Sequence, residues 1–361
     1  MTVVPNQRRP WARLKKKKTA LAGLVIIALS FFLAVFAYFI SPDSSPNANR
    51  MIVEIGGRKP GFIQQFLLLP VNDHIPPTPV FERLLSGKRD QYEYLPIEGY
   101  RIQSPYLIVD RYIDEGIAEQ ASYPLSMFDS DIKSHIIKKK FLLGTDKYGR
   151  DILSRLIVGV RVSLAVGIVT VILSLLIGVS LGAIAGYFRG RADNIIMWLI
   201  NVVWSIPTLL LVFAITLVLG KGFWQVFIAI GLTTWVNVAR LIRGQVMGLK
   251  QLEYVEAGKA LGFSSARIIV RHILPNVMGP VIVIAASNFA TAIVIEAGLS
   301  FLGVGVQPPQ PSWGLMIKEN YNFIITQNPM LALAPGFAIM ILVLAFNMLG
   351  NGLRDALQVK A

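Results

Sequence analysis

The chain contains no cysteine among its 361 residues and only three histidines. The absence of cysteine excludes disulfides, thiolate catalysis and zinc–thiolate sites. His74, His135 and His272 lie far apart in the sequence, and none belongs to an H-x-x-x-H or H-E-x-x-H pattern. The sequence therefore predicts no catalytic residue and no metal or cofactor bound by this chain.

Charged residues are scarce as well, at 16% against 54% hydrophobic residues. Apolar residues gather in blocks long enough to cross about 30 Å of hydrocarbon at about 1.5 Å per residue. We expect each block to be a transmembrane helix, so the predicted fold class is an all-α polytopic membrane protein. The blocks are residues 20–40, 162–186, 194–219, 223–243, 277–302 and 330–351.

The first block follows the lysines at 15–18, a pattern that also precedes cleaved signal peptides. Its apolar run of about 20 residues is longer than the usual signal core, and Ser41-Pro42-Asp43 offers no A-x-A cleavage site. An uncleaved membrane anchor is the favoured interpretation.

Acidic residues are few relative to basic ones, which gives a net charge of +14. The excess lies in residues 1–18 and 240–276, whereas basic and acidic residues nearly balance over 41–161. The positive-inside rule then places the N-terminus, 187–193, 244–276 and the C-terminus in the cytoplasm. Topology and lipid headgroups account for the charge, so nucleic acid is not an expected partner.

The segment between the first two blocks has ordinary polar composition. Residues 41–143 contain scattered prolines and short apolar runs such as 51–55 and 106–109, which we interpret as strands. The apolar stretch 62–71 is too short to span and is expected to be a core segment or an interfacial helix. The predicted domains are residues 1–40, an external mixed or β-rich insert at 41–143, and a helical core with five transmembrane helices at 144–361.

A loop between the fourth and fifth blocks carries the most specific pattern. Tyr254, Ala257, Gly258 and Leu261 fall at i, i+3, i+4 and i+7, which predicts one semi-apolar stripe on a helix outside the membrane. Small residues on that stripe allow another backbone to approach closely.

A second short helix is expected after the first. Gly262 suits a left-handed helix end and Ser264 an N-cap, and the new helix is expected to end at Pro275. The result is a compact helix–turn–helix. An equally favoured interpretation is a helix pair lying on the headgroups, with Arg267 and Arg271 snorkelling.

The run Glu256-Ala257-Gly258-x-x-x-Gly262, followed by Ile273-Leu274-Pro275-Asn276, resembles the EAA motif of ABC importer permeases. The chain departs from that motif at Gly258, where alanine is usual, and at His272, where many members have isoleucine. The resemblance implies that loop 244–276 docks into a cleft on a separate cytoplasmic ATPase. The implied coupling residues are Tyr254, Glu256, Ala257, Gly258, Ala260, Leu261, Gly262, Arg267, Leu274 and Pro275.

Two further stretches resemble signatures of the dipeptide and oligopeptide branch of these permeases, Gly144 to Arg155 and Leu299 to Gly314. The resemblance implies a six-helix type I importer permease in a bacterial inner membrane. It also implies a second permease, two ATPase subunits that hold ATP and magnesium, an external solute-binding protein, and a peptide or small-solute substrate. No Walker sequence occurs in this chain, which agrees with a separate ATPase.

Other motifs concern helix packing. The apolar positions of 152–160 share a face opposite Arg150, Asp151, Ser154 and Arg155, which predicts a short interfacial helix on the outer surface. The glycines at 178, 182 and 186 predict a groove for close helix contact.

Three residues are candidates for the pathway or a gate. Pro207 lies within the third block and is expected to kink it, as a hinge or to shape the bundle. Glu296 is the only ionisable residue well inside a block, and it either lines the pathway or holds the following loop. Asn288 lies on the same helix and is a possible pore-lining residue.

Competing functions are less well supported. An ion-coupled secondary transporter predicts repeated halves and intramembrane acid pairs, and Glu296 alone is too few. A membrane enzyme needs clustered polar groups near an interface, which the sequence lacks. A permease for another small solute, such as a nickel chelate, remains an alternative to the peptide permease.

Overall fold

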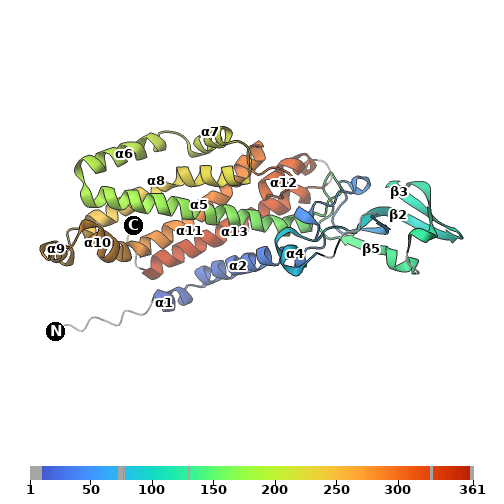
Figure 1. Ribbon diagram of the computed structural model, residues 1–361, viewed down its shortest axis with the longest axis horizontal. Helices are drawn as coiled ribbons and strands as arrows, with labels where there is room; N and C mark the ends of the chain where they lie inside the picture. Colours follow the sequence, from blue (N-terminus) through green and yellow to red (C-terminus); the bar gives the residue numbers. More distant parts are fainter. Residues whose placement is uncertain (1–9, 72–75, 77, 129–130, 326–327, 358–361) are drawn as a thin grey trace. The chain divides into compact units, whose positions relative to one another are not determined.

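The computed structural model describes residues 10–71, 76, 78–128, 131–325 and 328–357. Of the residues discussed above, His74 and part of the basic N-terminus (1–9) lie outside these ranges. The chain forms two compact units (Figure 1). The first comprises Met1–Phe31, Ser163–Gln307 and Ile339–Ala361, and the second Phe32–Val162 and Pro308–Ala338.

Within the described ranges, five helices are long and apolar enough to cross a membrane, which confirms five of the six expected blocks. Three of them are α2 (Lys18–Val35), α5 (Ile152–Phe188) and α8 (Phe223–Leu249). The other two are the continuous helix Ser265–Leu302, which contains α11 (Leu274–Leu302), and α13 (Met330–Leu357).

The sixth expected span is broken. Residues 190–219 form α6 (Gly190–Trp204) and α7 (Thr208–Leu219), which meet at an angle of 92°. Pro207 precedes α7 as its N-cap residue, because it has no N–H to continue the hydrogen-bond ladder of α6. The prediction of one kinked helix over 194–219 is therefore wrong, and the bent pair stands in its place.

The predicted interfacial helix at 152–160 is also wrong. These residues are the first turns of α5, which continues without interruption to Phe188 over 37 residues. No proline interrupts the sequence from 152 to 188, so nothing removes a backbone donor from the ladder.

The glycine groove of α5 is confirmed and is filled by α8. A Cβ on Gly178 would lie 2.5 Å from the Cβ of Val238, and one on Gly182 would lie 2.5 Å from the carbonyl oxygen of Ala239. A Cβ on Gly186 would lie 2.7 Å from the carbonyl oxygen of Arg243. Hydrogen in place of a side chain therefore lets the two backbones touch over two turns.

A β-rich insert between the first two spans is confirmed. Its strands are β1 (Phe62–Pro70), β2 (Tyr92–Gln103), β3 (Tyr106–Asp114), β4 (Ile117–Pro124) and β5 (Ile136–Phe141). They form one antiparallel sheet in the order β4-β3-β2-β1-β5. The stretch at 62–71 is thus an interior strand and not an interfacial helix, whereas the strand expected at 51–55 is wrong, since Val53–Ile55 is a 3₁₀ turn.

Hydrophobic side chains pack on both faces of the sheet. Leu67, Ile97 and Leu107 lie on one face, and Phe66, Tyr112 and Phe141 lie on the other, as the period of two in a strand requires.

Shorter elements complete the described chain. The short helices are α1 (Pro10–Lys16), α3 (Ala37–Ile40), α4 (Val80–Ser86), α9 (Glu253–Ala260), α10 (Ser265–Ile268) and α12 (Trp313–Asn320). The remaining 3₁₀ turns are Pro46–Ala48, Leu125–Met127, Ile132–His135 and Tyr321–Ile324.

Candidate functional site

The loop after α8 folds into two short helices, α9 and α10, which we call the coupling knob (residues 253–268). Gly262 has a φ of 77°, the left-handed conformation in which glycine is favoured. The Ser264 side chain accepts a hydrogen bond from the Arg267 backbone N–H at 3.4 Å and so caps α10. The predicted helix–turn–helix, with its glycine stop and serine cap, is confirmed.

The face by which the knob packs differs from the predicted stripe. Val255 is 1% exposed and Gly258 is buried, whereas Ala257 is exposed. A Cβ on Gly258 would lie 3.4 Å from the Phe263 ring, so the small residue makes room for the knob's own second half. The buried face of α9 is therefore formed by positions 255 and 258, which are three residues apart.

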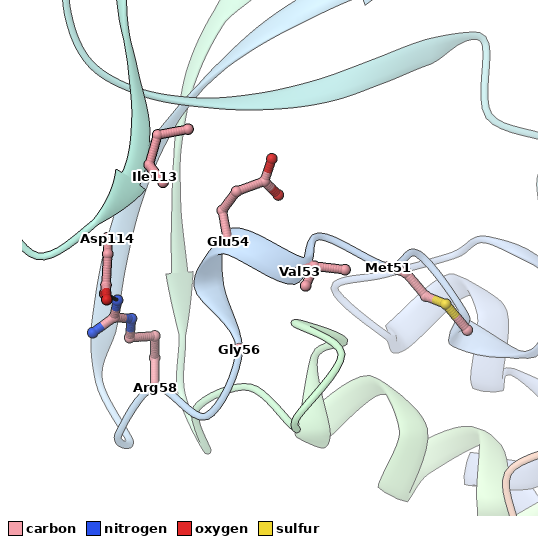
Figure 2. A pocket seen from close by; sticks show the side chains of 7 residues that line it. All are labelled: Met51, Val53, Glu54, Gly56, Arg58, Ile113 and Asp114. Atoms are coloured by element: carbon pink, nitrogen blue, oxygen red, sulfur yellow. Dashed lines mark hydrogen bonds and ion pairs between the residues drawn. The ribbon is translucent and has the colours of Figure 1, made fainter. Parts of the chain in front are cut away.

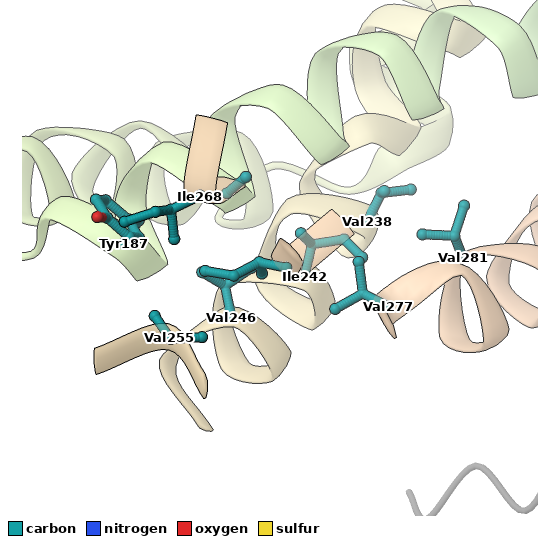
Figure 3. Packing of buried hydrophobic residues seen from close by; sticks show 10 residues of the cluster. Tyr187, Val238, Ile242, Val246, Val255, Ile268, Val277 and Val281 are labelled. Atoms are coloured by element: carbon teal, nitrogen blue, oxygen red, sulfur yellow. The ribbon is translucent and has the colours of Figure 1, made fainter. Parts of the chain in front are cut away.

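A continuous hydrophobic cluster joins the knob to the helices (Figure 3). Val255 and Ile268 of the knob pack in the same cluster as Ile242 of α8 and Val277 of α11. Close-packed interiors transmit displacement because they have few voids to absorb it. The cluster thus places the knob in contact with three helices, α5, α8 and α11. The cluster is Ala183, Tyr187, Val238, Ile242, Val246, Val255, Ile268, Ile273, Val277 and Val281.

The opposite face of the knob is bare. Leu261 is 72% exposed and Tyr254 is 41% exposed, and Ala257 lies between them on the helix. The Tyr254 hydroxyl accepts a hydrogen bond from the Asn276 side-chain amide at 3.3 Å, which holds the ring in place. The surface has an apolar centre, and its exposed rim consists of Glu256, Lys259, Ala260, Gly262 and Arg267, whose guanidinium stacks on Phe263 at 4.0 Å.

The helix after the knob does not end at Pro275, contrary to the prediction. A π-helical turn, Ile269–Ile273, leads directly into α11, and Pro275 occupies the first turn of that helix. Pro275 has no N–H to continue the hydrogen-bond ladder, and the π turn lies directly before this interruption. The π turn shifts the inward positions to Ile268, Ile273 and Val277, so Leu274 is half-buried and Pro275 exposed.

Lys250 connects the base of the knob to α5. Its ammonium donates a hydrogen bond to the Tyr187 carbonyl at 2.6 Å and lies 5.2 Å from the centre of the Tyr187 ring. The Lys259 ammonium lies 5.9 Å from the same ring. Burial lowers the pKa of Lys250, and the nearby charges of Lys259 and Arg189 lower it further.

The Glu296 side chain is 1% exposed and is therefore buried among other residues of this chain. Its carboxylate accepts a hydrogen bond from the Ser300 hydroxyl at 2.6 Å, and the Ser300 oxygen accepts one from the Val306 N–H at 3.0 Å. These bonds fold the turn after α11 back onto the helix. The geometry favours the second of the two roles considered for Glu296, a structural bond to the following loop.

The other two pathway candidates lie elsewhere. Asn288 is buried and its side-chain amide donates to the Ser174 hydroxyl at 3.3 Å, which joins α11 to α5. Pro207 lies at the exposed break between α6 and α7. The described contacts join none of the three candidates to another.

The second unit contains a buried ionic cluster where the sequence predicts the polar face of an interfacial helix. Arg150 donates to Asp146 at 2.6 Å and to Glu319 of α12 at 2.7 Å. Arg155 lies between the same carboxylates, at 3.9 Å from Asp146 and 3.7 Å from Glu319. Both arginines are 1% exposed. The helical period was read correctly, but the partner Glu319 is distant in sequence.

The same region also binds the chain that follows α3. The Asp43 backbone N–H donates to the Ser154 hydroxyl at 2.8 Å, and the Ser154 backbone N–H donates to Asp151 at 3.0 Å. Burial raises the pKa of Asp151, and the bonds from Ser154 partly offset that effect. The signature from Gly144 to Arg155 is thus the polar core at the start of α5.

An open groove of about 590 Å³ lies beside the sheet (Figure 2). Its walls include the exposed side chains of Met51 and Val53, and Arg58 closes one end through a 2.6 Å ion pair with Asp114. In Figure 2, Glu54 points away from Arg58, and it pairs with Arg111 at 2.6 Å. Each charged side chain that lines the groove therefore has a partner of opposite charge.

These features define a multi-pass membrane protein with an exposed helix–turn–helix that is packed into its helical bundle. A family model described as the inner membrane component of binding-protein-dependent transport systems matches residues 178–360. The chain belongs to this family and is a permease subunit of an ABC importer in an inner membrane. A second model, the N-terminal transmembrane domain of oligopeptide transport permease C, matches residues 8–53.

Curated relatives agree with this assignment. The glutathione transport permease GsiD of Pectobacterium atrosepticum is 41% identical over 64% of this chain and 77% of its own length. The oligopeptide permease OppC of Bacillus subtilis is 43% identical over 62% and 72%. The dipeptide permease DppC of Lactococcus lactis is 32% identical over 97% and 90%, a match long enough to include the insert.

A solved structure is also similar. A chain of the inward-facing MetNI methionine ABC transporter aligns with a TM-score of 0.47 and 18% identity, over 58% of this chain and 98% of that chain.

Proposed function

We propose that this permease carries dipeptides or oligopeptides and forms the translocation pathway together with a second permease subunit. The observation that carries the proposal is the combination of two family matches with relatives that are named as dipeptide, oligopeptide and glutathione permeases. Glutathione is itself a short peptide, so the relatives share one chemical class of substrate. An external solute-binding protein delivers the substrate in this proposal.

The coupling knob is proposed to dock a separate ATPase, which binds ATP and magnesium. Its bare face has an exposed apolar centre, Leu261 and Tyr254, with exposed charges around it, the usual composition of a protein interface. Its opposite face is fixed in the cluster that reaches α5, α8 and α11. ATP-driven movement of the ATPase is thereby passed into the spanning helices.

The proposed orientation puts the knob and both termini in the cytoplasm and the β-rich insert outside. The support is the excess of basic residues in 1–18 and 240–276. A reporter that is active only in the cytoplasm should work when fused after Gly262 and fail when fused after Gln91. The reverse pattern would refute the orientation and leave the family assignment intact.

Docking is tested by charge changes on the bare face. Leu261→Arg and Glu256→Arg alter exposed side chains, so the fold should survive, while ATPase co-purification and peptide uptake should fall about tenfold or more. Glu98→Arg, an exposed charge reversal in β2 of the insert, is the matched control and should leave both unchanged. Normal co-purification of the two knob variants would contradict the docking role.

A further inference from the structure

Arg240 of α8 is an exposed cation within a candidate membrane span. Arg243, one turn further on, is neutralised by Asp193 of α6 through bonds of 2.5 and 2.7 Å. Arg240 has no such acid in the part of the chain that the structure describes. The two arginines therefore differ in kind: one is paired inside this chain, and the other is available to another molecule.

Trp204 holds Arg240 in a defined position. Its guanidinium lies 4.0 Å from the centre of the Trp204 ring, at the end of α6. The indole N–H of Trp204 donates to Asn237 Oδ1 at 3.1 Å. Because that oxygen is engaged, the side-chain NH₂ group of Asn237 is left to bond elsewhere, and no described residue accepts from it. The cluster of Trp204, Asn237 and Arg240 thus offers hydrogen-bond donors and positive charge, which suits an anion.

The direction of the Arg240 side chain argues against a lipid anchor. Trp204 binds Asn237, which precedes Arg240 by about one turn, so the guanidinium is held toward the first half of α8. An arginine that snorkels to the cytoplasmic headgroups would extend along α8 toward Leu249 instead. A charge turned into the span is costly unless it meets water, protein or a ligand.

An exposed strip of α8 runs from this cluster toward the end of the helix at Leu249. It continues through Gly244 and Gly248, where an added Cβ would meet nothing within 4 Å. A strip in contact with hydrocarbon would carry large apolar side chains, as the exposed Leu176 does on α5. The small residues leave open space in which water or a passing solute can reach the cluster.

The broken span adds an independent observation. α7 begins at Thr208, four residues after Trp204, and no side chain caps its N-terminus. The unpaired N–H groups at the start of this 12-residue helix carry partial positive charge. Discontinuous helices in transporters place such ends at anionic groups of the substrate.

We propose that Trp204, Asn237 and Arg240 form a carboxylate-binding site on the translocation pathway, which receives the C-terminal carboxylate of a peptide in transit. This inference rests on the proposed peptide import. Arg240 and Asn237 supply donors to the carboxylate, and Trp204 orients both.

Accessibility is tested first, using the absence of native cysteine in this chain. In the assembled transporter, Gly244→Cys should react with a charged, membrane-impermeant thiol reagent, and Leu176→Cys should not. N-acetylalanine should slow labelling at position 244, whereas its uncharged amide should not. Arg240→Gln should abolish that protection. Lack of labelling at 244, or equal protection by acid and amide, would overturn the proposal whether or not peptides are the substrate.

Transport is tested second, by uptake of an alanine dipeptide into proteoliposomes. Arg240→Gln should lower uptake about tenfold, since a bond to a charged group is lost. Arg240→Lys should lower it less than that, because the positive charge is kept while the planar stacking on Trp204 is lost. Lys221→Gln, an exposed cation between α7 and α8, is the control and should match the wild type.

Three transport results have different meanings. If Arg240→Gln takes up the dipeptide as fast as the wild type does, the carboxylate site is refuted and the proposed peptide import is unaffected. Loss of the second permease from purified Arg240→Gln complexes would identify Arg240 as an interface residue and also overturn it. A wild-type transporter that imports no peptide refutes the proposed function, and the labelling experiment then decides the anion site separately.

Discussion

Glu296 illustrates how a buried carboxylate in a span can serve structure. Glu296→Ala removes the acceptor for Ser300, which in turn receives the Val306 N–H, so we expect unfolding to become easier by about 1–3 kcal/mol. Glu296→Gln keeps an acceptor and should lose much less. Thermal unfolding of the purified protein in detergent measures both. A loss of uptake in the glutamine variant without a loss of stability would contradict this role and favour a pathway role.

Asp151 makes the stability of the second unit depend on pH. Its pKa is raised above the ordinary 3.8, so the folded state holds the proton more tightly than the unfolded chain. The stability that it contributes is complete below about pH 3.8 and is lost as pH rises through the folded-state pKa.

Asp151→Asn removes that dependence. Relative to this variant, the wild type should therefore gain thermal stability as the pH is lowered from 7 toward 4. Melting curves of both proteins at several pH values provide the measurement, and parallel curves would show that Asp151 does not titrate in this window.

At the residue scale, the sequence revealed local features and missed distant partners. Gly262 and Ser264 act within their own turn, so their roles could be predicted. Arg150 and Arg155 lie on the face opposite the apolar one, as expected, but whether that face meets water or Glu319 depends on a contact far along the chain. Periodicity reports the side of a helix and says nothing of what covers it.

At the scale of elements, the contact between α5 and α8 depends on the missing side chains of its glycines. Gly182→Ala would place a Cβ 2.5 Å from the Ala239 carbonyl, so we expect destabilisation of about 1–3 kcal/mol. Gly244→Ala places a Cβ in open space on α8 and should be neutral or slightly stabilising. Thermal unfolding distinguishes the two, and equal effects would show that helix propensity alone is at work.

The break between α6 and α7 shows the limit of hydropathy at this scale. The apolar block 194–219 has the length of one span, and Pro207 alone does not distinguish a gentle kink from a bend of 92°. Proline removes one hydrogen bond, but the packing of both halves against α8 sets the angle. The π turn before Leu274 was not predicted either. It changes which positions of the helix face inward, and no particular residue type in the sequence signals it.

For the whole molecule, residues far apart in sequence are joined by few strong contacts. Glu319 binds Arg150 at 2.7 Å, which ties α12 to the segment before α5. Glu319→Gln leaves two buried arginines with a single close carboxylate, so we expect a loss of about 3 kcal/mol in stability. Thermal unfolding tests this, and Glu98→Gln on the exposed side of β2 should stay within about 0.5 kcal/mol. Equal melting points for the two variants would contradict the role of the cluster.

The general architecture could be predicted from sequence, because a membrane requires long apolar segments and the family motif requires particular residues at fixed spacing. Apolar block lengths revealed the spans, and the run around Glu256 pointed to the family that the comparisons then confirmed. The polar insert obeys no such constraint. Its short apolar runs and scattered prolines predicted a β-rich fold, but the order of strands depends on pairing between distant segments.

That strand order leaves β4 and β5 as the two edges of the sheet, where unpaired backbone groups invite a strand from another molecule. β5 carries Lys138, Lys139 and Lys140 in succession, and β4 ends at Pro124, which lacks an N–H. Repulsion between lysines and the missing donor both oppose edge-to-edge pairing. Many copies of this subunit can therefore lie close together in one membrane without their inserts joining into a common sheet.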